Sequence, residues 1–591
     1  MAKGTFLRQT LNERQVNMMA FSACIGFGLF LHTGEVLNVA GPGLAVVAFL
    51  LATSVFWCVV SCLGEMTALF PVQGPLFEFP ARYLDDAVGY AVGWMAWFSW
   101  AVTISNQALA VAAQWRFRVP ASYLLQVRYP DAELGWGTES ASPAVWVIIT
   151  LLIVLGVNVL PVRWYGRAEY VFGCLKMGFI CGLILFNVIL ATREGTRRGD
   201  SFWTWNHPYH YAAPNYTIHP TSPAPIVVTG DSGRALSLWA GVTTSFFAFT
   251  GFEIIALSAA ENKDLETYET IKLGSRKLTL RLGLLYILAT FTASLVVPYD
   301  DPMLQDTRTG HTLGGQHSVF IIAAVRAGLR GFPTFFNAFF IFSATTSAIN
   351  GVYVSSRLLH ALAGIPEAWP RPLHGIRRTL ASTSAHGVPL AAVFYSWLFG
   401  LLAFLALRPL PGKVHARLVE FVTVQCLVCY GAICLSYTQF YGVLSRVVKD
   451  PGDVGISAEQ RSAYDRDNTY YPYRTFGQRA RAWYGVVFCG LLVVGNKWTA
   501  FIKPFDTADF LASYSVIAAY VLIIAAYHVR SDGWRLWKWR RHASLNIQRP
   551  PPKVVVPGRR RGRLHLPNPK HALWEADNMR AIGAWMWLWL K

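Results

Sequence analysis

Residues 21–30 read Phe-Ser-Ala-Cys-Ile-Gly-Phe-Gly-Leu-Phe and lie midway along the first apolar segment, residues 16–39. That segment is long enough to cross a bilayer as a helix. Two glycines, Gly26 and Gly28, make the middle of this helix easy to unwind. In lipid, unwound backbone is tolerated only where it lines a protein cavity or binds something. The alternative is that both glycines only allow close helix packing.

A second interruption is expected in the sixth apolar segment, residues 235–261. There Thr250, Gly251 and Glu253 place a glycine and an acid inside an otherwise apolar run. Carriers use broken helices to hold a substrate at mid-membrane, where a half-helix N-terminus faces an anionic group. Two interrupted helices five segments apart predict an inverted five-plus-five repeat, which favours substrate binding over packing as the role of the glycines.

The composition indicates a membrane protein. Of the 591 residues, 53% are hydrophobic and 14% are charged, and the mean hydropathy is +0.34. We therefore predict an all-α polytopic membrane protein with about twelve transmembrane helices. The formal net charge of +19 is spread between the apolar segments and over the C-terminal tail, so it does not indicate a nucleic-acid partner. The predicted spans are residues 16–39, 41–70, 88–115, 143–160, 168–192, 235–261, 279–298, 334–361, 388–407, 418–445, 482–497 and 509–529.

The sequence offers little evidence for an enzyme active site or a metal site. All nine cysteines lie within or at the edges of apolar segments, which is not a disulfide framework. Cys426 and Cys429 have the spacing of metal ligands, but no second pair or histidine accompanies them, so packing is favoured and no metal site is predicted. Neither paired acids nor a nucleophile triad lies on one side of the membrane, so we expect no enzyme activity and no cofactor beyond a coupling proton.

An even number of spans places both termini on one side of the membrane. The bias of Lys and Arg between the loops favours the cytoplasm for both. We divide the chain into a cytoplasmic N-terminus (1–15), a transmembrane domain (16–529) and a basic cytoplasmic tail (530–591). The sequon at Asn215 falls in the long loop between the fifth and sixth spans, on the outer side, and predicts a glycosylation site.

Two polar side chains inside spans are candidates for function. Gln107, in the third span, is expected either to contact a substrate or to bridge helices. Lys176 is read as the single charge of the fifth span, roughly 12 Å from its cytoplasmic end. An ammonium group at that depth is costly unless it pairs, snorkels to the interface or loses its proton. Loss of the proton would make Lys176 a proton carrier without any metal ion.

Taken in order, these motifs resemble the fungal (yeast-type) amino acid permeases of the amino acid–polyamine–organocation (APC) superfamily. The likeness runs from about residue 11 to residue 528. The matching stretches are Ile25-Gly26-Phe27-Gly28-Leu29-Phe30, Ala40-Gly41-Pro42-Gly43, Gly64-Glu65-Met66, Phe70-Pro71-Val72-x-Gly74, Gly93-Trp94 with Ser99-Trp100, Tyr165-Gly166-x-x-Glu169, Lys176, the run 246–253, Ala260-Glu261-Asn262, Arg281 with Tyr286, the run 297–302, Asn337-Ala338, Tyr353 with Ser356-Arg357, Gly387-Val388-Pro389 and Pro472-Tyr473-Arg474.

The resemblance implies a five-plus-five core with two extra helices, which moves L-amino acids with protons. It implies that backbone groups of the two turns hold the α-carboxylate and α-ammonium, that the aromatic pair Phe247 and Phe249 occludes the substrate, and that Lys176 carries the proton. The substrate-binding residues it implies, together with Gln107, are Ser22, Ala23, Ile25, Gly26, Phe27, Gly28, Phe247, Phe249, Thr250, Gly251, Phe252 and Glu253.

The sequence departs from the family pattern at positions that bear on the pocket. Phe27 and Phe252 stand where the family usually has threonine, and Gln107 stands where it has glutamate. A smaller or more apolar pocket follows, and threonine at either phenylalanine position is expected to widen the set of accepted side chains. The expected function is import of L-amino acids by proton symport at the plasma membrane, with membrane lipid as the other partner. The alternatives are transport of a polyamine or γ-aminobutyrate, residence in the vacuole, and a non-transporting amino acid sensor of the same fold.

Overall fold

The computed structural model describes residues 10–198, 200–207, 210–219, 225–262, 270–309, 314–407, 411–449, 465–467, 471, 473–474 and 477–532. The expectations for residues 1–9 and for the tail beyond residue 532 lie outside this part. The all-α prediction is confirmed, because the strands among the described residues are two short antiparallel hairpins. These are β1 (Arg118–Val119) with β2 (Leu134–Gly135), and β3 (Asn215–Ile218) with β4 (Ile226–Thr229).

Each of the twelve predicted spans coincides with helix. In chain order the helices are α1 (Glu13–Cys24) with α2 (Phe27–Ala40), α3 (Pro42–Leu69), α5 (Asp86–Trp115), α7 (Pro143–Val159), α8 (Val162–Arg198), α10 (Gly230–Phe246) with η2 (Phe247–Phe249) and α11 (Ile254–Leu257), α12 (Thr270–Ser294), α15 (Phe332–Ala363), α17 (Leu390–Trp397) with η7 (Leu398–Ala406), α18 (Pro411–Lys449), α20 (Gln478–Gly495) and α21 (Thr507–Asp532).

Not all of these helices are long and apolar enough to cross a membrane. Over the described residues eight meet that standard, or nine when the bent pair α1–α2 counts as one span. The helix α7 and the pair α17–η7 are apolar but shorter, and α12 also falls below the standard. The count of twelve therefore stays a prediction.

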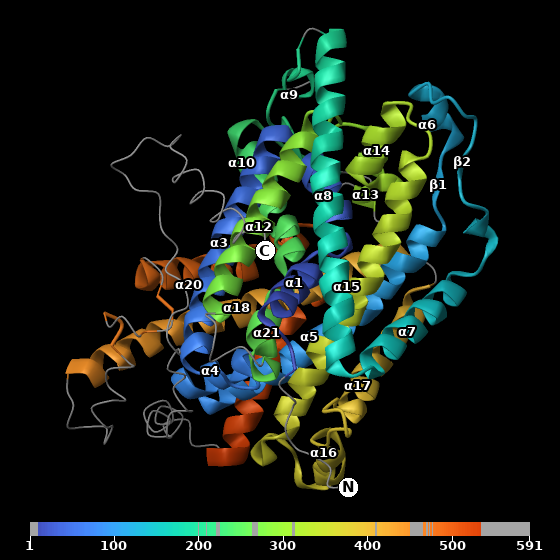
Figure 1. Ribbon diagram of the computed structural model, residues 1–591. Helices are drawn as coiled ribbons and strands as arrows, with labels where there is room; N and C mark the ends of the chain where they lie inside the picture. The colour runs from blue at the N-terminus through green and yellow to red at the C-terminus, as the bar shows by residue number, and fades with distance from the viewer. Residues whose placement is uncertain are drawn as a thin grey trace, which may run out of the picture.

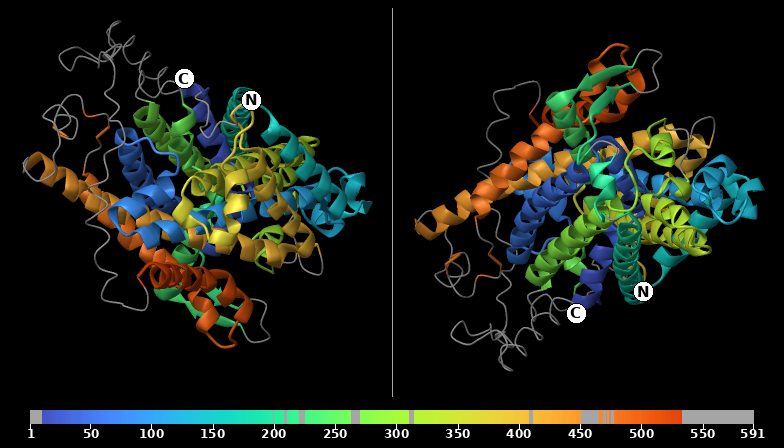
Figure 2. Two further views of the ribbon diagram at one scale, coloured as in Figure 1. Left: turned by 90° about the horizontal axis from the view of Figure 1, so that it is seen from below. Right: turned by 90° about the horizontal axis from the view of Figure 1, so that it is seen from above.

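The connections alternate between two ends of the bundle. They contain α4 (Pro75–Tyr83), α6 (Ala121–Gln126), η1 (Gly137–Ser140), α9 (Trp203–Asn206), η3 (Ser258–Glu261), α13 (Pro302–Thr309), η4 (Gly315–His317), α14 (Val319–Arg326), η5 (Pro366–Ala368), η6 (Arg371–Leu373), α16 (His374–Leu380) and η8 (Trp498–Phe501). Figure 1 shows α9, α13 and α14 at one end and α4 and α16 at the other. We call these the β3–β4 end and the α4 end. At the first of them the β3–β4 hairpin packs beside η8 and the start of α21 (Figure 2), and His219 contacts the Ile502 carbonyl at 3.1 Å.

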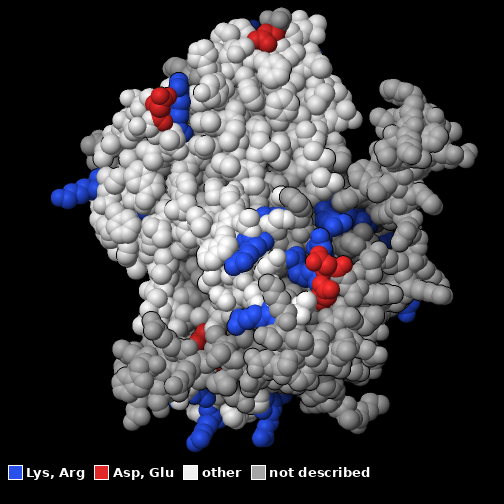
Figure 3. All heavy atoms as spheres, turned by 90° about the vertical axis from the view of Figure 1, so that its left-hand side faces the viewer, with Lys and Arg blue, Asp and Glu red and all other residues white. Residues whose placement is uncertain are grey.

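The polarity of the bundle is reversed relative to a water-soluble protein. Helix α8 exposes the apolar side chains Leu175, Leu185 and Ile189, whereas it buries Lys176 and Asn187 completely. Figure 3 shows a face on which a broad area carries no charged side chain, while Lys and Arg gather below it. A surface of this kind suits hydrocarbon, and the polar groups turned inward mark a protein-lined interior.

Both predicted interruptions are present at the centre of the bundle. Helix α1 ends at Cys24, α2 begins at Phe27, and their axes bend by 41°. In the sixth segment η2 ends at Phe249 and α11 begins at Ile254. Helix α1 lies between α8, α12 and α15 (Figure 1), so the first break is enclosed by protein on these sides. The inverted-repeat relation between the two halves of the chain stays a prediction.

Candidate functional site

A small pocket lies where the two interrupted helices meet. Its volume is about 10 Å³, which is room for about one water molecule. It is lined from the first break, the sixth segment, α5 and α15, and none of the side chains in this lining is Asp, Glu, Lys, Arg or His. The lining residues are Ala23, Cys24, Gly26, Gly28, Trp100, Thr103, Gln107, Phe247, Ala248, Thr250 and Ser347.

The carbonyl groups freed by the first break are satisfied by side chains of three surrounding helices. Lys176 Nζ on α8 donates to the carbonyl oxygens of Ser22 (2.7 Å) and Ile25 (2.6 Å). Ser343 Oγ on α15 donates to the Ile25 oxygen at 3.0 Å. The Tyr286 hydroxyl on α12 lies 3.0 Å from the Cys24 oxygen and 3.1 Å from the Ala248 oxygen, so it links both interrupted helices. Carbonyl groups that would otherwise lack hydrogen-bond donors in an apolar medium are thus satisfied by side chains of neighbouring helices.

Lys176 is therefore not at the membrane interface. Its side chain is fully buried and its ammonium group ends at the break of the first helix. Snorkelling, the alternative considered from the sequence, does not occur in this structure.

The second break is stabilised by hydrogen bonds to Glu253, which lies within it. Glu253 Oε2 accepts a hydrogen bond from the Gly251 backbone N–H at 3.0 Å, and Oε1 accepts one from the Tyr430 hydroxyl. Gly251 has a φ of +118°, and a Cβ there would lie 2.9 Å from the Ala23 carbonyl carbon and 3.0 Å from the Cys24 nitrogen. Glycine is required at this position both by its backbone angle and by the contact between the two breaks.

Gln107 bridges two helices, and its contact with a substrate stays a prediction. It lines the pocket, and its Nε2 donates to Ser347 Oγ at 3.0 Å, which bridges α5 and α15. A Cβ on Gly26 would lie 2.9 Å from each of these two atoms. A Cβ on Gly28 would lie 3.2 Å from the Phe247 ring. The two glycines thus open the space that the pocket occupies.

The structure brings only part of the predicted set to the pocket. Of the residues named from the sequence, it is lined by Ala23, Gly26, Gly28, Gln107, Phe247 and Thr250. Four others hold the breaks rather than line the pocket, namely Ser22, Ile25, Gly251 and Glu253. The lining residues that were missed are Cys24, Trp100, Thr103, Ala248 and Ser347. Thr103 and Ser347 belong to polar runs in the third and eighth spans, which was the available signal.

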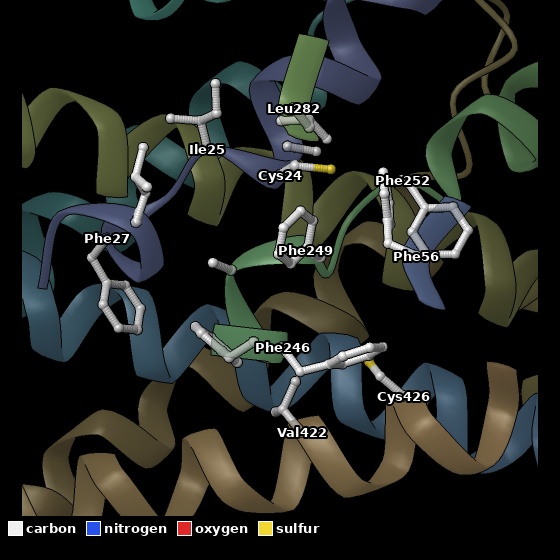
Figure 4. Packing of buried hydrophobic residues seen from close by; sticks show 14 of the residues in the cluster. Cys24, Ile25, Phe27, Phe56, Phe246, Phe249, Phe252, Leu282, Val422 and Cys426 are labelled. Carbon is white, nitrogen blue, oxygen red and sulfur yellow. The ribbon is translucent and has the colours of Figure 1, made fainter. Parts of the chain in front are cut away.

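Three predicted aromatic rings pack beside the breaks instead of in the lining. Phe27 lies 5.5 Å from Phe247 between ring centroids, and Phe252 lies 5.1 Å from Phe56. Phe249 lies 5.1 Å from Tyr286. Figure 4 shows Phe27 on one side of the first break and Phe252 with Phe56 on the other. The lining thus omits three rings that the sequence analysis placed among the substrate-binding residues.

This packing changes the expected result of replacing Phe252. Because its ring fills space between Phe56 and Tyr430, we expect Phe252→Thr to lower stability by roughly 3 kcal/mol and to leave the competition profile unchanged. Thermal unfolding in detergent and competition uptake with a panel of amino acids measure the two effects. A wider set of competitors would instead place the ring in the substrate pocket.

A larger cavity of about 320 Å³ lies toward the β3–β4 end. Its wall carries ion pairs, among them Lys497–Glu420 at 2.6 Å and Arg417–Asp509 at 3.1 Å. Phe247 lines both this cavity and the small pocket, so its ring stands between them. The position fits the predicted occluding role of Phe247.

The α4 end of the pathway is closed by buried contacts. The backbone N–H groups of Thr10 and Leu11 donate to the Glu261 carbonyl oxygen at 2.9 and 3.0 Å. The Glu261 carboxylate accepts from Tyr353 at 2.7 Å and pairs with Arg357 at 3.1 Å. The start of α1, the end of the sixth segment and α15 are thereby tied together, while the opposite end holds the open cavity.

One expectation for the fifth span is wrong. Lys176 was read as its single charge, but α8 also carries Glu169, whose side chain is completely buried. Its Oε2 accepts a hydrogen bond from Asn350 Nδ2 at 2.8 Å. Residue 169 lies inside the predicted span 168–192, so this second charge is visible in the sequence itself.

Asn215 opens strand β3 and is exposed to solvent, so its side chain is accessible. Its glycosylation stays a prediction.

The chain is similar to known membrane permeases over most of its length. A family model described as amino acid permease matches residues 15–449. The lysine/arginine permease of Candida albicans is 27% identical over 522 residues, which cover 88% of this chain and 80% of the relative. The proline-specific permease of Emericella nidulans is 27% identical over 537 residues, covering 89% and 86%. The dicarboxylic amino acid permease of Saccharomyces cerevisiae is 28% identical over 533 residues, covering 89% and 78%.

Proposed function

Because the chain belongs to the amino acid permease family, which comprises membrane transporters rather than enzymes, we propose that it imports L-amino acids by proton symport and alternating access. We place it in the plasma membrane with both termini in the cytoplasm, so that the β3–β4 end faces outward. The observation that carries the proposal is the contact of Lys176 with the broken first helix, where a titratable group and the candidate substrate turn meet.

The contact offers a direct route from protonation to substrate binding. A lysine ammonium has three N–H donors and no acceptor, so it holds two carbonyl oxygens at once. A neutral amine is a weaker donor, and hydrogen bonds from charged groups are about twice as strong as neutral ones. Protonation of Lys176 therefore stabilises the turn at Ser22–Ile25, which is the conformation that presents the backbone around Gly26 to a substrate carboxylate.

Alternating access is supported by the asymmetry of the two ends. The outer cavity reaches Phe247, whereas the inner end is tied by the contacts around Glu261. Rotation of the Phe247 ring would join the cavity to the pocket, and release of the Glu261 contacts would open the opposite side. A pocket of about 10 Å³ must expand before it holds an amino acid, so we assign the structure to an occluded, unloaded state.

The side-chain class of the substrate follows from the lining. The named relatives take basic amino acids, proline or dicarboxylic amino acids. Because the described lining carries no Asp, Glu, Lys, Arg or His, it offers no partner for a charged substrate side chain. We therefore infer that this chain prefers amino acids with uncharged side chains. A polyamine, which lacks a carboxylate, would also find no acidic partner there.

The proposal is tested by uptake of labelled amino acids in a permease-deficient host. Uptake is expected to rise as the external pH falls, because protons are a co-substrate, and to vanish with a protonophore. Unlabelled neutral amino acids should compete, while lysine, aspartate and putrescine should not. Uptake that needs sodium and ignores pH would contradict the symport, and competition by putrescine alone would favour an amine substrate.

A further inference from the structure

Glu169 is a buried acid to which the proposed transport cycle gives no role. It lies seven residues before Lys176 on α8, which places it two helical turns away on the same face. Both side chains are completely buried, whereas Val171 and Leu175 between them are about half exposed, at 52% and 51%. The face that carries Glu169 and Lys176 therefore points into the bundle.

Glu169 is only half satisfied by hydrogen bonds. Its Oε2 accepts from Asn350 Nδ2 at 2.8 Å, but its Oε1 is buried and has no hydrogen-bond partner in the part of the chain that the structure describes. An incompletely paired carboxylate in an apolar interior is costly, and such groups persist mainly where they have a function.

Ser22 connects Glu169 with the lysine. Its carbonyl oxygen accepts a hydrogen bond from Lys176 Nζ at 2.7 Å. Its hydroxyl is buried beside the Glu169 carboxylate and makes no hydrogen bond that meets normal geometry with any described residue. Lys176 and Glu169 are therefore both adjacent to Ser22, at its carbonyl and its hydroxyl respectively. The two groups thus share one polar niche behind the first break.

The other titratable and charged groups around this niche are already engaged. On α8 the Tyr165 hydroxyl donates to Asn350 Oδ1 at 2.7 Å, and its ring stacks on Tyr353 of α15 at 4.6 Å. From η3, the Glu261 carboxylate is occupied by Tyr353 and Arg357. Cys24 of α1 and Arg281 of α12, with Tyr170 and Cys174 of α8, are the other titratable groups near the niche. Within the described residues, Glu169 is the acid that offers Lys176 an unoccupied oxygen.

We propose that Glu169 is the inner proton acceptor of this transporter, which takes the proton from Lys176 and passes it toward the cytoplasm. This inference rests on the proposed proton symport. Lys176 and Glu169, both described in the structure, form no direct ion pair, so the Ser22 hydroxyl beside Glu169 relays the proton. An Nζ–H bond of Lys176 breaks and its electron pair stays on nitrogen, the Ser22 oxygen takes up that proton, and the original Ser22 hydroxyl proton forms an O–H bond at Oε1 of Glu169. Ammonium and carboxylate both become neutral. Water from the cytoplasmic side then takes the proton as hydronium and restores the carboxylate, and hydronium from the outer cavity recharges Lys176.

The placement of the two groups supports this direction of transfer. On the proposed orientation α8 starts at the cytoplasmic end with Val162, so Glu169 lies between Lys176 and the cytoplasm. On that side of Glu169, the Tyr165 ring of α8 stacks on Tyr353, which donates to Glu261. Opening of the inner end would bring water to the carboxylate, so release of the proton would occur only in the inward-open state.

The test uses the full chain in proteoliposomes with a pH indicator trapped inside. The probe is a mixture of the twenty common L-amino acids, supplied labelled for uptake and unlabelled for proton flux. In Glu169→Gln, uptake driven by an acidic exterior should fall by about tenfold or more, and internal acidification should be lost. Exchange of external label for internal amino acids should stay near the wild-type rate, because a carrier that keeps its proton still shuttles in the loaded form.

The Glu169→Gln variant distinguishes a role in proton transfer from a structural role, because its amide has the same shape as the carboxyl group. Glutamine still accepts the hydrogen bond from Asn350, so a structural role predicts wild-type behaviour in all three measurements, and that result would overturn the inference. Glu13→Gln is the matched control, because it neutralises an acid on α1 that lies 3.9 Å from Lys277 instead of Lys176. It should keep both gradient-driven uptake and exchange.

Three outcomes distinguish the inference about Glu169 from the proposed symport. If Glu169→Gln also loses exchange, Glu169→Asp is measured. Recovery of gradient-driven uptake with a shifted pH profile supports the acceptor role, and any other result overturns it. If the wild-type protein is not driven by the pH gradient, the proposed symport fails, and the inner acceptor fails with it. If the wild type is driven and Glu169→Gln is driven equally, only the inference about Glu169 fails.

Discussion

Lys176→Ala is expected to abolish accumulation driven by a pH gradient, while substrate binding and exchange persist at a reduced level. The change removes the group that we propose to carry the proton. It also leaves the Ser22 carbonyl without a donor, although Ile25 keeps its hydrogen bond from Ser343. A buried carbonyl that loses its partner costs about 1–3 kcal/mol, so we also expect a lower unfolding temperature.

Lys176→Arg separates charge from proton transfer. A guanidinium group keeps the positive charge and its donors, but it does not lose its proton at accessible pH. We therefore expect the arginine variant to fail in gradient-driven uptake, by about tenfold or more, although it retains a cation near the break. Uptake from an acidic medium with and without a protonophore, together with binding of labelled substrate, measures the two parts of this prediction.

The control for Lys176→Arg is the same substitution at Lys277. That lysine lies on α12 with 5% of its surface exposed and its Nζ is 3.9 Å from Glu13, so a longer cation can keep the pair. Lys277→Arg should transport normally. Concentrative, proton-driven uptake by Lys176→Arg would show that Lys176 acts as a fixed positive charge and would contradict its role as proton carrier.

Much of the fold was predictable because lipid imposes a simple rule. Backbone in hydrocarbon must be helical, so apolar runs of about twenty residues locate helices, and glycines inside a run locate breaks. Both predicted interruptions are found, at Ile25–Gly26 and between Phe249 and Ile254. The number of spans is harder to predict, since α12 is lined by polar groups that face protein, and hydropathy does not distinguish such a helix from an interfacial one.

The positions of site residues were predictable where the backbone conformation determines them. They were not predictable where they depend on the direction in which a side chain points. Gly26 lies in the pocket lining because unwound backbone in lipid must face protein, and Gly28 follows it in the first turn of α2. Phe27 and Phe252 are neighbours of the breaks in sequence, but each ring turns away to pack on another ring. That direction depends on residues far away along the chain, such as Tyr430 beside Phe252, and no local sequence pattern predicts it.

Glu169 illustrates a second limit. Its burial depends on Asn350, which lies 181 positions along the chain. From the sequence it is an acid near the start of a helix, a position where carboxylates are common and exposed. The resemblance did include Glu169 in a matching motif, but a motif carries no information about depth. Contacts between distant helices, rather than composition, turn this residue into a candidate for proton transfer.

Gly26→Val is expected to reduce substrate binding to background while the protein still reaches the membrane. A Cβ at this position would lie 2.9 Å from both Gln107 Nε2 and Ser347 Oγ, which are themselves joined at 3.0 Å. Valine would push these two groups apart and fill a pocket of about 10 Å³. A β-branched side chain also restricts the backbone of the turn that must rearrange around a carboxylate.

The matched control is the same substitution at a glycine that faces lipid. Gly178 lies on α8, is exposed, and has no atom within 4 Å of an added Cβ. Gly178→Val should bind and transport like the wild type, which removes glycine loss in a membrane helix as the explanation. Binding of labelled amino acids to membranes, normalised to surface abundance, makes the comparison. Normal transport by Gly26→Val would reduce this glycine to a packing residue, and the substrate turn would then have to lie in the sixth segment alone.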